Sequence, residues 1–251
     1  MMNKILVNKN VINSDSKGIM VVDNVITFIS DGDYSLEYVE CDDIKIVFLV
    51  DGCNVRLQES SFDNEVVVNN RYEITNGSLI VNKFYNNKSV RENIVINLNK
   101  DGDRIDYNFS SISRLEEYYR IDIYHKSKKT VSNISNKSVA LKNSILNFIV
   151  NSNVYKDSIF SKLDQNTRIV TMGDSSCKIC PNMFIDLDEV EARHGSVIGT
   201  FKDDQLFYLM SKGISYNDAI KLLIKGFILG NIVVNLDLRV LINNVIEMYW
   251  R

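Results

Sequence analysis

The feature that most constrains the fold is a succession of short β-rich segments over almost all of the first 190 residues. About a dozen such segments, rich in Val, Ile, Phe and Tyr, are separated by short polar connections. Only SRLEEYY (113–119) has a helical period in this part of the chain. Such a chain is expected to form a sandwich, a barrel or a β-solenoid. The clearest segments are IMVVDNVITFI (19–29), IKIVFLV (44–50), EVVVNNRYEI (65–74), RIDIYH (120–125) and SILNFIV (144–150).

The connections favour the solenoid among these three architectures. Tight hairpins need dipeptides such as Asn-Gly or Asp-Gly, which occur only at 31–32, 51–52, 76–77 and 101–102. The connections are instead rich in asparagine, which tolerates the left-handed backbone conformation of a corner better than most residues. Because no strict short repeat is present, we expect an irregular solenoid.

The pattern becomes helical after residue 200. Asp203 and Asp204 precede QLFYLMSKG, and Gly213 is a natural helix stop. Ser215 is expected to cap a second helix over 216–231, whose apolar residues share one face. LDLRVLINNVIEMYW (236–250) has the period of a third helix. The chain is therefore predicted to be a β body followed by a small helical tail.

Composition narrows the class of protein. The chain has 251 residues, of which 45% are hydrophobic and 24% charged, as in a folded globular protein. A net charge of −3 argues against nucleic-acid binding and against binding to an anionic membrane. No run approaches the roughly 18 apolar residues of a membrane span, and the start lacks a secretory signal pattern. Four cysteines are too few for a disulfide-stapled scaffold, so we expect a cytoplasmic protein.

Cysteines and acidic residues give two weak signals of chemistry. Cys177 and Cys180 form one C-x-x-C pair, but a structural zinc site needs four ligands, so we expect two unpaired thiols. Asp186 and Asp188 would share a strand face and suggest the paired carboxylates of a sugar-cleaving β-helix enzyme. A solvated strand face explains these two residues at least as well.

The two histidines, His125 and His194, lie at or near the ends of predicted strands. A lone histidine is more often a packed or hydrogen-bonded residue than a metal ligand. The sequence has no phosphate-binding P-loop, no dinucleotide-binding glycine motif and no nucleophile elbow. We therefore do not expect a nucleotide-hydrolysing motor protein.

One long run adds a resemblance. HGSVIGTFKDDQLFYLMSKGISYNDAIKLLIKGFI (194–228) is similar to the C-terminal signature of the SufB/SufD family, the scaffold components of SUF iron–sulfur cluster assembly. Pro181 lies 13 positions before His194, as in the family, and segments around 125–130, 136–150 and 165–166 resemble its β-helix rungs. The chain is closest to the SufD type: glycine follows His194, and Asn166 stands where SufB has a cysteine. It departs from many SufD members in having Ala192 two residues before the histidine.

The resemblance implies a mainly β fold, a right-handed parallel β-helix over residues 1–200 with a C-terminal α-helical tail over 201–251. It implies a cytoplasmic scaffold subunit that works with a SufC-type ABC ATPase and pairs through its β-helix, as a homodimer or with a SufB-like protein. An iron–sulfur cluster would bind only transiently, with no tightly bound cofactor. His194 is then the candidate cluster and metal ligand and Glu191 a weaker metal ligand; the tail residues expected to contact the ATPase are Phe207, Tyr208, Ser211, Gly213, Leu222 and Phe227.

Two alternative functions stay open at this point. The chain can be an interaction-only SufD-like paralogue that has lost cluster chemistry and only holds its partners. A β-helix carbohydrate enzyme is a third reading, and it depends on Asp186 or Asp188.

Overall fold

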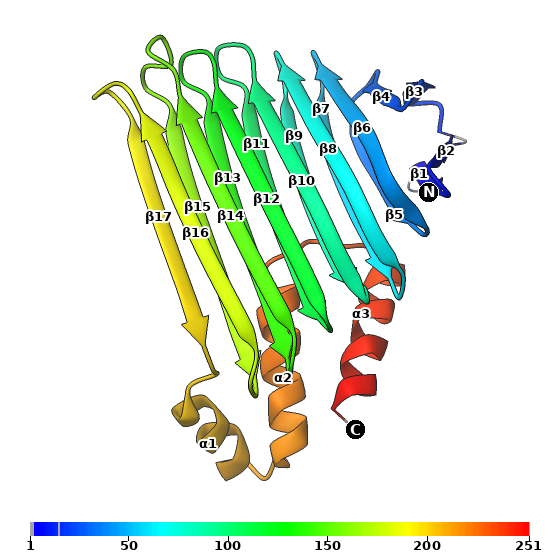
Figure 1. Ribbon diagram of the computed structural model, residues 1–251, viewed down its shortest axis with the longest axis vertical. Coiled ribbons are helices and arrows are strands. Elements are labelled where there is room, and N and C mark those ends of the chain that lie inside the picture. The colour runs from blue at the N-terminus through cyan, green and yellow to red at the C-terminus, as the bar shows by residue number, and fades with distance from the viewer. Residues whose placement is uncertain (1–2, 15, 251) are drawn as a thin grey trace.

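The computed structural model describes residues 3–14 and 16–250 (Figure 1). The predicted β-helix (1–200) and helical tail (201–251) include four residues outside the described ones: Met1, Met2, Asp15 and Arg251. The strands are β1 (Asn3–Asn8), β2 (Val11–Ser14), β3 (Ile19–Val22), β4 (Val25–Phe28), β5 (Gly32–Tyr38), β6 (Cys41–Asp51), β7 (Asn54–Phe62), β8 (Glu65–Thr75), β9 (Ser78–Asn86), β10 (Ser89–Leu98), β11 (Arg104–Ser113), β12 (Glu116–His125), β13 (Val131–Leu141), β14 (Ile145–Val154), β15 (Lys162–Met172), β16 (Ser176–Ile185) and β17 (Glu191–Gly199). The helices are α1 (Asp203–Ser211), α2 (Tyr216–Leu229) and α3 (Leu236–Tyr249).

Successive strands alternate between two sheets. One sheet, which we call the odd-numbered sheet although it also contains β2, has the order β17-β15-β13-β11-β9-β7-β5-β1-β2. The other sheet has the order β16-β14-β12-β10-β8-β6-β4-β3. From β4 to β15, each strand pairs in parallel with the strand two places along the chain, as in the pairing of β11 with β13. This arrangement is a parallel β-solenoid, and it confirms the predicted mainly β fold with a C-terminal helical tail.

The length of a solenoid turn varies along the chain, which explains why no repeat is visible in the sequence. Asp33 lies beside Arg56, 23 residues later, whereas Asn136 lies beside Thr167, 31 residues later. The extra residues are taken up in the corners. Among the described residues, ten non-glycine residues have a positive φ and seven of them are Asn or Asp. Asparagine-rich corners are thus confirmed, with the left-handed conformation as their physical reason.

Two predicted elements are wrong. The segment 19–29 is a hairpin of β3 and β4, because Asp23 and Asn24 both have positive φ and form the tight turn that antiparallel strands require. The segment 113–119 is not helical: it contains the end of β11 and the start of β12. Glu116 is paired with Ser89 on one side and Ile145 on the other, so ladder pairing overrides the local helical period.

The helical tail matches the prediction closely. The Ser215 hydroxyl accepts the Asp218 N–H at 3.2 Å and caps α2, while Gly213 adopts a φ of +85° after α1. The buried face of α2 and part of α3 pack on outward side chains of the odd-numbered sheet, including Phe84 and Val139. The helices gather along one end of the strands (Figure 1). No helix in the described part of the chain is long and apolar enough to cross a membrane.

Candidate functional site

The two ends of the solenoid differ. At the N-terminal end, the short antiparallel hairpins β1–β2 and β3–β4 form the outermost strands. At the C-terminal end, the long strands β16 and β17 are the outermost, and within residues 3–14 and 16–250 each pairs on one side only. Nearly all of β17 is exposed. A long exposed edge presents unpaired backbone N–H and C=O groups, which natural proteins usually cover or blunt.

His194 lies on this open end and faces the solenoid interior. It is aligned with Gln165 of β15, whose side chain is buried, and aligned residues of parallel strands point to the same face. Its imidazole is exposed because no further turn follows. The imidazole of His194, which is the predicted metal ligand, is therefore accessible at the open end of the solenoid.

Glu191 does not converge with His194. The two residues are three positions apart on an extended strand, so their side chains point to opposite faces. Glu191 instead bonds Lys162 at 2.9 Å, and this contact lowers the pKa of its carboxyl group. The structure thus offers one imidazole at this place rather than an imidazole–carboxylate pair.

The other sequence-level candidates are also dispersed. Cys177 is aligned with inward-facing Leu146 and Cys180 with outward-facing Ile149, so the two free thiols lie on opposite faces and do not form a chelating pair. Asp186 forms an exposed ion pair with Lys156 at 3.7 Å. No three His, Cys, Asp or Glu side chains among the described residues are grouped to hold a metal ion.

His125 has a structural environment. Its side chain is fully buried, its Nδ1 lies 2.7 Å from the Thr130 hydroxyl, and its Nε2 lies 2.9 Å from the Ser132 hydroxyl. Burial lowers its pKa to about 4, so the ring is neutral near pH 7. Both ring nitrogens are used within the chain, which leaves none for a ligand.

The helical tail carries an exposed apolar surface on α1 and the start of α2, which we call the α1 face. Phe207 is 66% exposed and Tyr208 64%, and α1 has no buried residue. Met210, Tyr216 and Leu222 are further exposed apolar side chains on α1 and α2, and the sequence prediction did not include the first two. A helix with this little burial of its own apolar side chains is typical of a docking element.

Three further predicted contact residues have internal roles. Phe227 is only 8% exposed and packs on Lys137 and Arg168, whose charged groups are 5.6 and 5.5 Å from its ring centre. It therefore anchors α2 to the odd-numbered sheet. The Ser211 hydroxyl donates to the Tyr208 carbonyl at 2.7 Å, and Gly213 provides the turn after α1.

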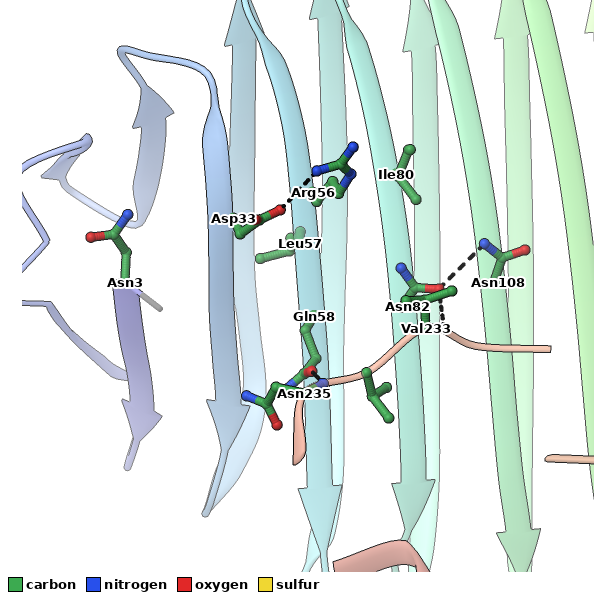
Figure 2. Close-up of a pocket in the computed structure, with 11 residues that line it drawn as sticks. Asn3, Asp33, Arg56, Leu57, Gln58, Ile80, Asn82, Asn108, Val233 and Asn235 are labelled. Atoms are coloured by element: carbon green, nitrogen blue, oxygen red, sulfur yellow. Dashed lines mark hydrogen bonds and ion pairs between the residues drawn. The ribbon is translucent and has the colours of Figure 1, made fainter. Parts of the chain in front are cut away.

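A groove of about 810 Å³ lies where the link between α2 and α3 crosses the odd-numbered sheet (Figure 2). The Val233 N–H donates to Asn82 at 2.9 Å, and the Asn235 N–H donates to Gln58 at 2.8 Å. Arg56 pairs with Asp33 at 3.4 Å on the groove wall. These contacts fix the tail on the solenoid, and we assign the groove no chemistry.

Sequence reasoning missed a charged cluster inside the solenoid. Lys83 is fully buried, with its ammonium 2.9 Å from Glu59 and 2.5 Å from Glu92, both also fully buried. Tyr38 and Tyr72 donate to Glu59. The signal in the sequence was alternation: each charged residue occupies an inward position of its strand. Glu59 is in register with Leu36, Lys83 with Phe109 and Glu92 with Val68, all of which are buried. This cluster supports the fold rather than the accessible site.

The family described as SUF system FeS cluster assembly, SufBD core domain, matches residues 52–227, well over half of the chain. The chain belongs to the SufBD core domain family. The matched span runs from the first long parallel strands to Phe227, so it includes the open end, His194 and the α1 face.

Curated relatives agree over shorter stretches. An iron–sulfur cluster assembly SufBD family protein of Mycobacterium leprae is 43% identical over 63 residues, which is 25% of this chain and 16% of the relative. A SufBD family protein of Pyrococcus horikoshii is 44% identical over 48 residues, 19% of this chain and 11% of the relative. The iron–sulfur cluster assembly protein SufD of Escherichia coli is 40% identical over 47 residues, again 19% and 11%. The aligned stretches thus span 16% or less of these relatives.

A solved polysaccharide lyase-like protein of C. thermocellum is 10% identical, with 80% of this chain and 100% of that chain covered. Its TM-score is 0.18, so the likeness bears on neither fold nor function.

Proposed function

We propose that this protein is a non-enzymatic, cytoplasmic scaffold subunit of SUF-type iron–sulfur cluster assembly, of the SufD type, that works with a SufC-type ABC ATPase. Family membership supports a role in SUF cluster assembly. The observation that carries the partner is the α1 face, whose aromatic residues Phe207 and Tyr208 are about two-thirds exposed. Burying such side chains on a partner gives roughly 1.5–3 kcal/mol each, which is the usual magnitude of an interface hot spot.

The open end supports pairing with a second β-solenoid. Strands β16 and β17 expose ladder groups together with the apolar side chains of Phe184, Val197 and Ile198, which are 58%, 54% and 45% exposed. A second copy, or a SufB-like chain, placed against this end would continue the ladder and cover Ile198, which faces the solenoid interior. The hairpins at the other end leave no comparable long edge.

The cluster is cargo of the proposed reaction. Because Glu191 points to the opposite face and the described residues hold no group of three donors, this chain contributes at most the His194 imidazole, and the paired chain would supply the remaining ligands. A neutral imidazole is a suitable borderline ligand for iron. The proposed site is therefore shared between two chains.

Co-expression with a SufC-type ATPase tests the partner. We expect a complex that survives a sizing column, with a mass equal to the sum of its components. Separate elution of the two proteins at micromolar concentrations would contradict the proposed partnership.

The interaction-only alternative, a SufD-like paralogue without cluster chemistry, is separated by anaerobic reconstitution with iron and sulfide in the presence of a SufB-like chain. The scaffold proposal predicts visible absorbance that His194→Ala reduces and Glu191→Gln, on the opposite face, does not. Equal absorbance in both variants would favour the interaction-only function.

A further inference from the structure

We propose that Gln165 is a positioning residue that fixes the tautomer and orientation of His194. Its side-chain carbonyl oxygen accepts the N–H of one ring nitrogen, so the other nitrogen presents its lone pair at the open end. The inference rests on the proposed function in that His194 is the proposed cluster ligand. Its test, however, needs neither a cluster nor an ATPase.

The first step is the orientation of the Gln165 amide. Its Nε2 donates to the Ser152 hydroxyl at 2.6 Å and to the Asn182 backbone carbonyl at 3.2 Å. A backbone carbonyl only accepts hydrogen bonds, so the atom that faces Asn182 must be the amide nitrogen. Both N–H groups are thereby used, and the side-chain carbonyl must point elsewhere.

The second step is the missing partner of that carbonyl. Gln165 is only 2% exposed, and its Oε1 is buried without a hydrogen-bond partner. Buried carbonyl oxygens in folded proteins nearly always have a donor, because an unpaired one loses its hydration without compensation. The orphaned oxygen therefore indicates a donor that reaches it in the functional arrangement.

The third step identifies the donor. In the parallel ladder, the same-face neighbours of Gln165 are Ile134 on β13 and His194 on β17, with strands about 4.8 Å apart. Ile134 has no polar atom, whereas the imidazole of His194 carries an N–H. Rotation of the exposed imidazole towards β15 brings this N–H to the Gln165 oxygen.

The consequence is a defined ligand geometry. A neutral imidazole has one donor and one acceptor nitrogen, and the hydrogen bond made by the first decides which nitrogen is free. Partners of this kind orient histidine ligands in metal sites generally. Because the Gln165 amide is held by Ser152 of β14 and Asn182 of β16, both in the opposite sheet, it transmits a fixed direction to an otherwise exposed ring.

Nitrogen-15 NMR of protein labelled at histidine tests the inference at pH 8.5, where an imidazole with an ordinary pKa near 6.5 is neutral. Only two histidines contribute signals, and His194→Ala assigns them. We expect one dominant tautomer for His194 and a tautomer ratio about tenfold closer to unity in Gln165→Met, as expected for loss of one net hydrogen bond. Ile134→Val is the control, because this other same-face neighbour of Gln165 has no polar atom, and the variant should preserve the ratio.

Three outcomes decide between the possibilities. An unchanged ratio in Gln165→Met overturns the inference. If that variant does not fold, wild-type protein alone decides: rapidly averaging tautomers of His194 overturn the inference, and a single tautomer supports it. None of these results bears on ATPase binding, and loss of the ATPase complex would leave the tautomer result standing.

Discussion

Replacing Glu117 with Gln should make the protein more stable at alkaline pH. Glu117 is fully buried; one carboxylate oxygen accepts from Ser111 and Tyr119, both at 3.0 Å, and the other has no partner. Burial raises the pKa of Glu117 from 4.5 to about 7. Because the pKa of Glu117 is raised in the folded state, folding favours the neutral acid. The free energy of unfolding is therefore not reduced by Glu117 below pH 4.5, and it falls as the pH rises from 4.5 to about 7.

The magnitude follows from that interval. At 1.36 kcal/mol per pH unit, keeping a charged Glu117 in the folded state costs about 3 kcal/mol above pH 7. A Gln side chain mimics the neutral acid and removes this cost. We therefore expect Glu117→Gln to match wild type near pH 4.5 and to exceed its free energy of unfolding by up to about 3 kcal/mol at pH 8.

Urea unfolding across pH 4.5–8.5 measures this difference. Glu116→Gln is the matched control: the neighbouring residue is exposed on the same strand, so its effect should stay within about 0.5 kcal/mol at all pH values. A stability difference between Glu117→Gln and wild type that does not change with pH would refute the reasoning.

The remaining predictions concern packing and buried charge. Lys83→Met should lower the free energy of unfolding by about 3–5 kcal/mol at pH 7, because it leaves Glu59 and Glu92 buried without their cation. This deficit should shrink on acidification, because burial raises the pKa of Glu92 and its protonation removes an unpaired buried charge; a deficit that grows on acidification would contradict it. Gly77→Ala should cost about 1–3 kcal/mol or more in denaturant unfolding, because a Cβ there would lie 2.3 Å from a backbone oxygen. Gly226→Ala, in an open position within α2, should instead stabilise by about 0.5–1 kcal/mol; the same sign for both alanine variants would contradict the argument.

Some elements followed directly from local physics. The helical period after residue 200, the cap at Ser215 and the stop at Gly213 each have a local cause, and each was found as predicted. The asparagine-rich corners also follow from backbone preferences. The hairpin turn at Asp23 and Asn24 was missed because this pair, unlike Asp-Gly, gives a weak turn signal.

The faces of the strands were less predictable. A Lys or Glu at alternate positions of a strand normally indicates a solvated face, yet Lys83 and Glu117 point inwards because buried partners neutralise or hydrogen-bond them. Likewise, the orphaned oxygen of Gln165 depends on which residues lie one turn away, and irregular turn lengths conceal that register in the sequence. The prediction that Phe207 and Tyr208 contact a partner came from a family resemblance, and the structure adds that both side chains are exposed.

The most direct test of the account is the affinity of a SufC-type ATPase for this protein and two variants. Phe207→Asp places a charge in the α1 face, and Val233→Asp places one at a residue that is 82% exposed on the link between α2 and α3. The account predicts that Phe207→Asp raises Kd by about 30-fold or more and that Val233→Asp leaves Kd unchanged. Equal affinities for wild type and Phe207→Asp would contradict docking through the α1 face.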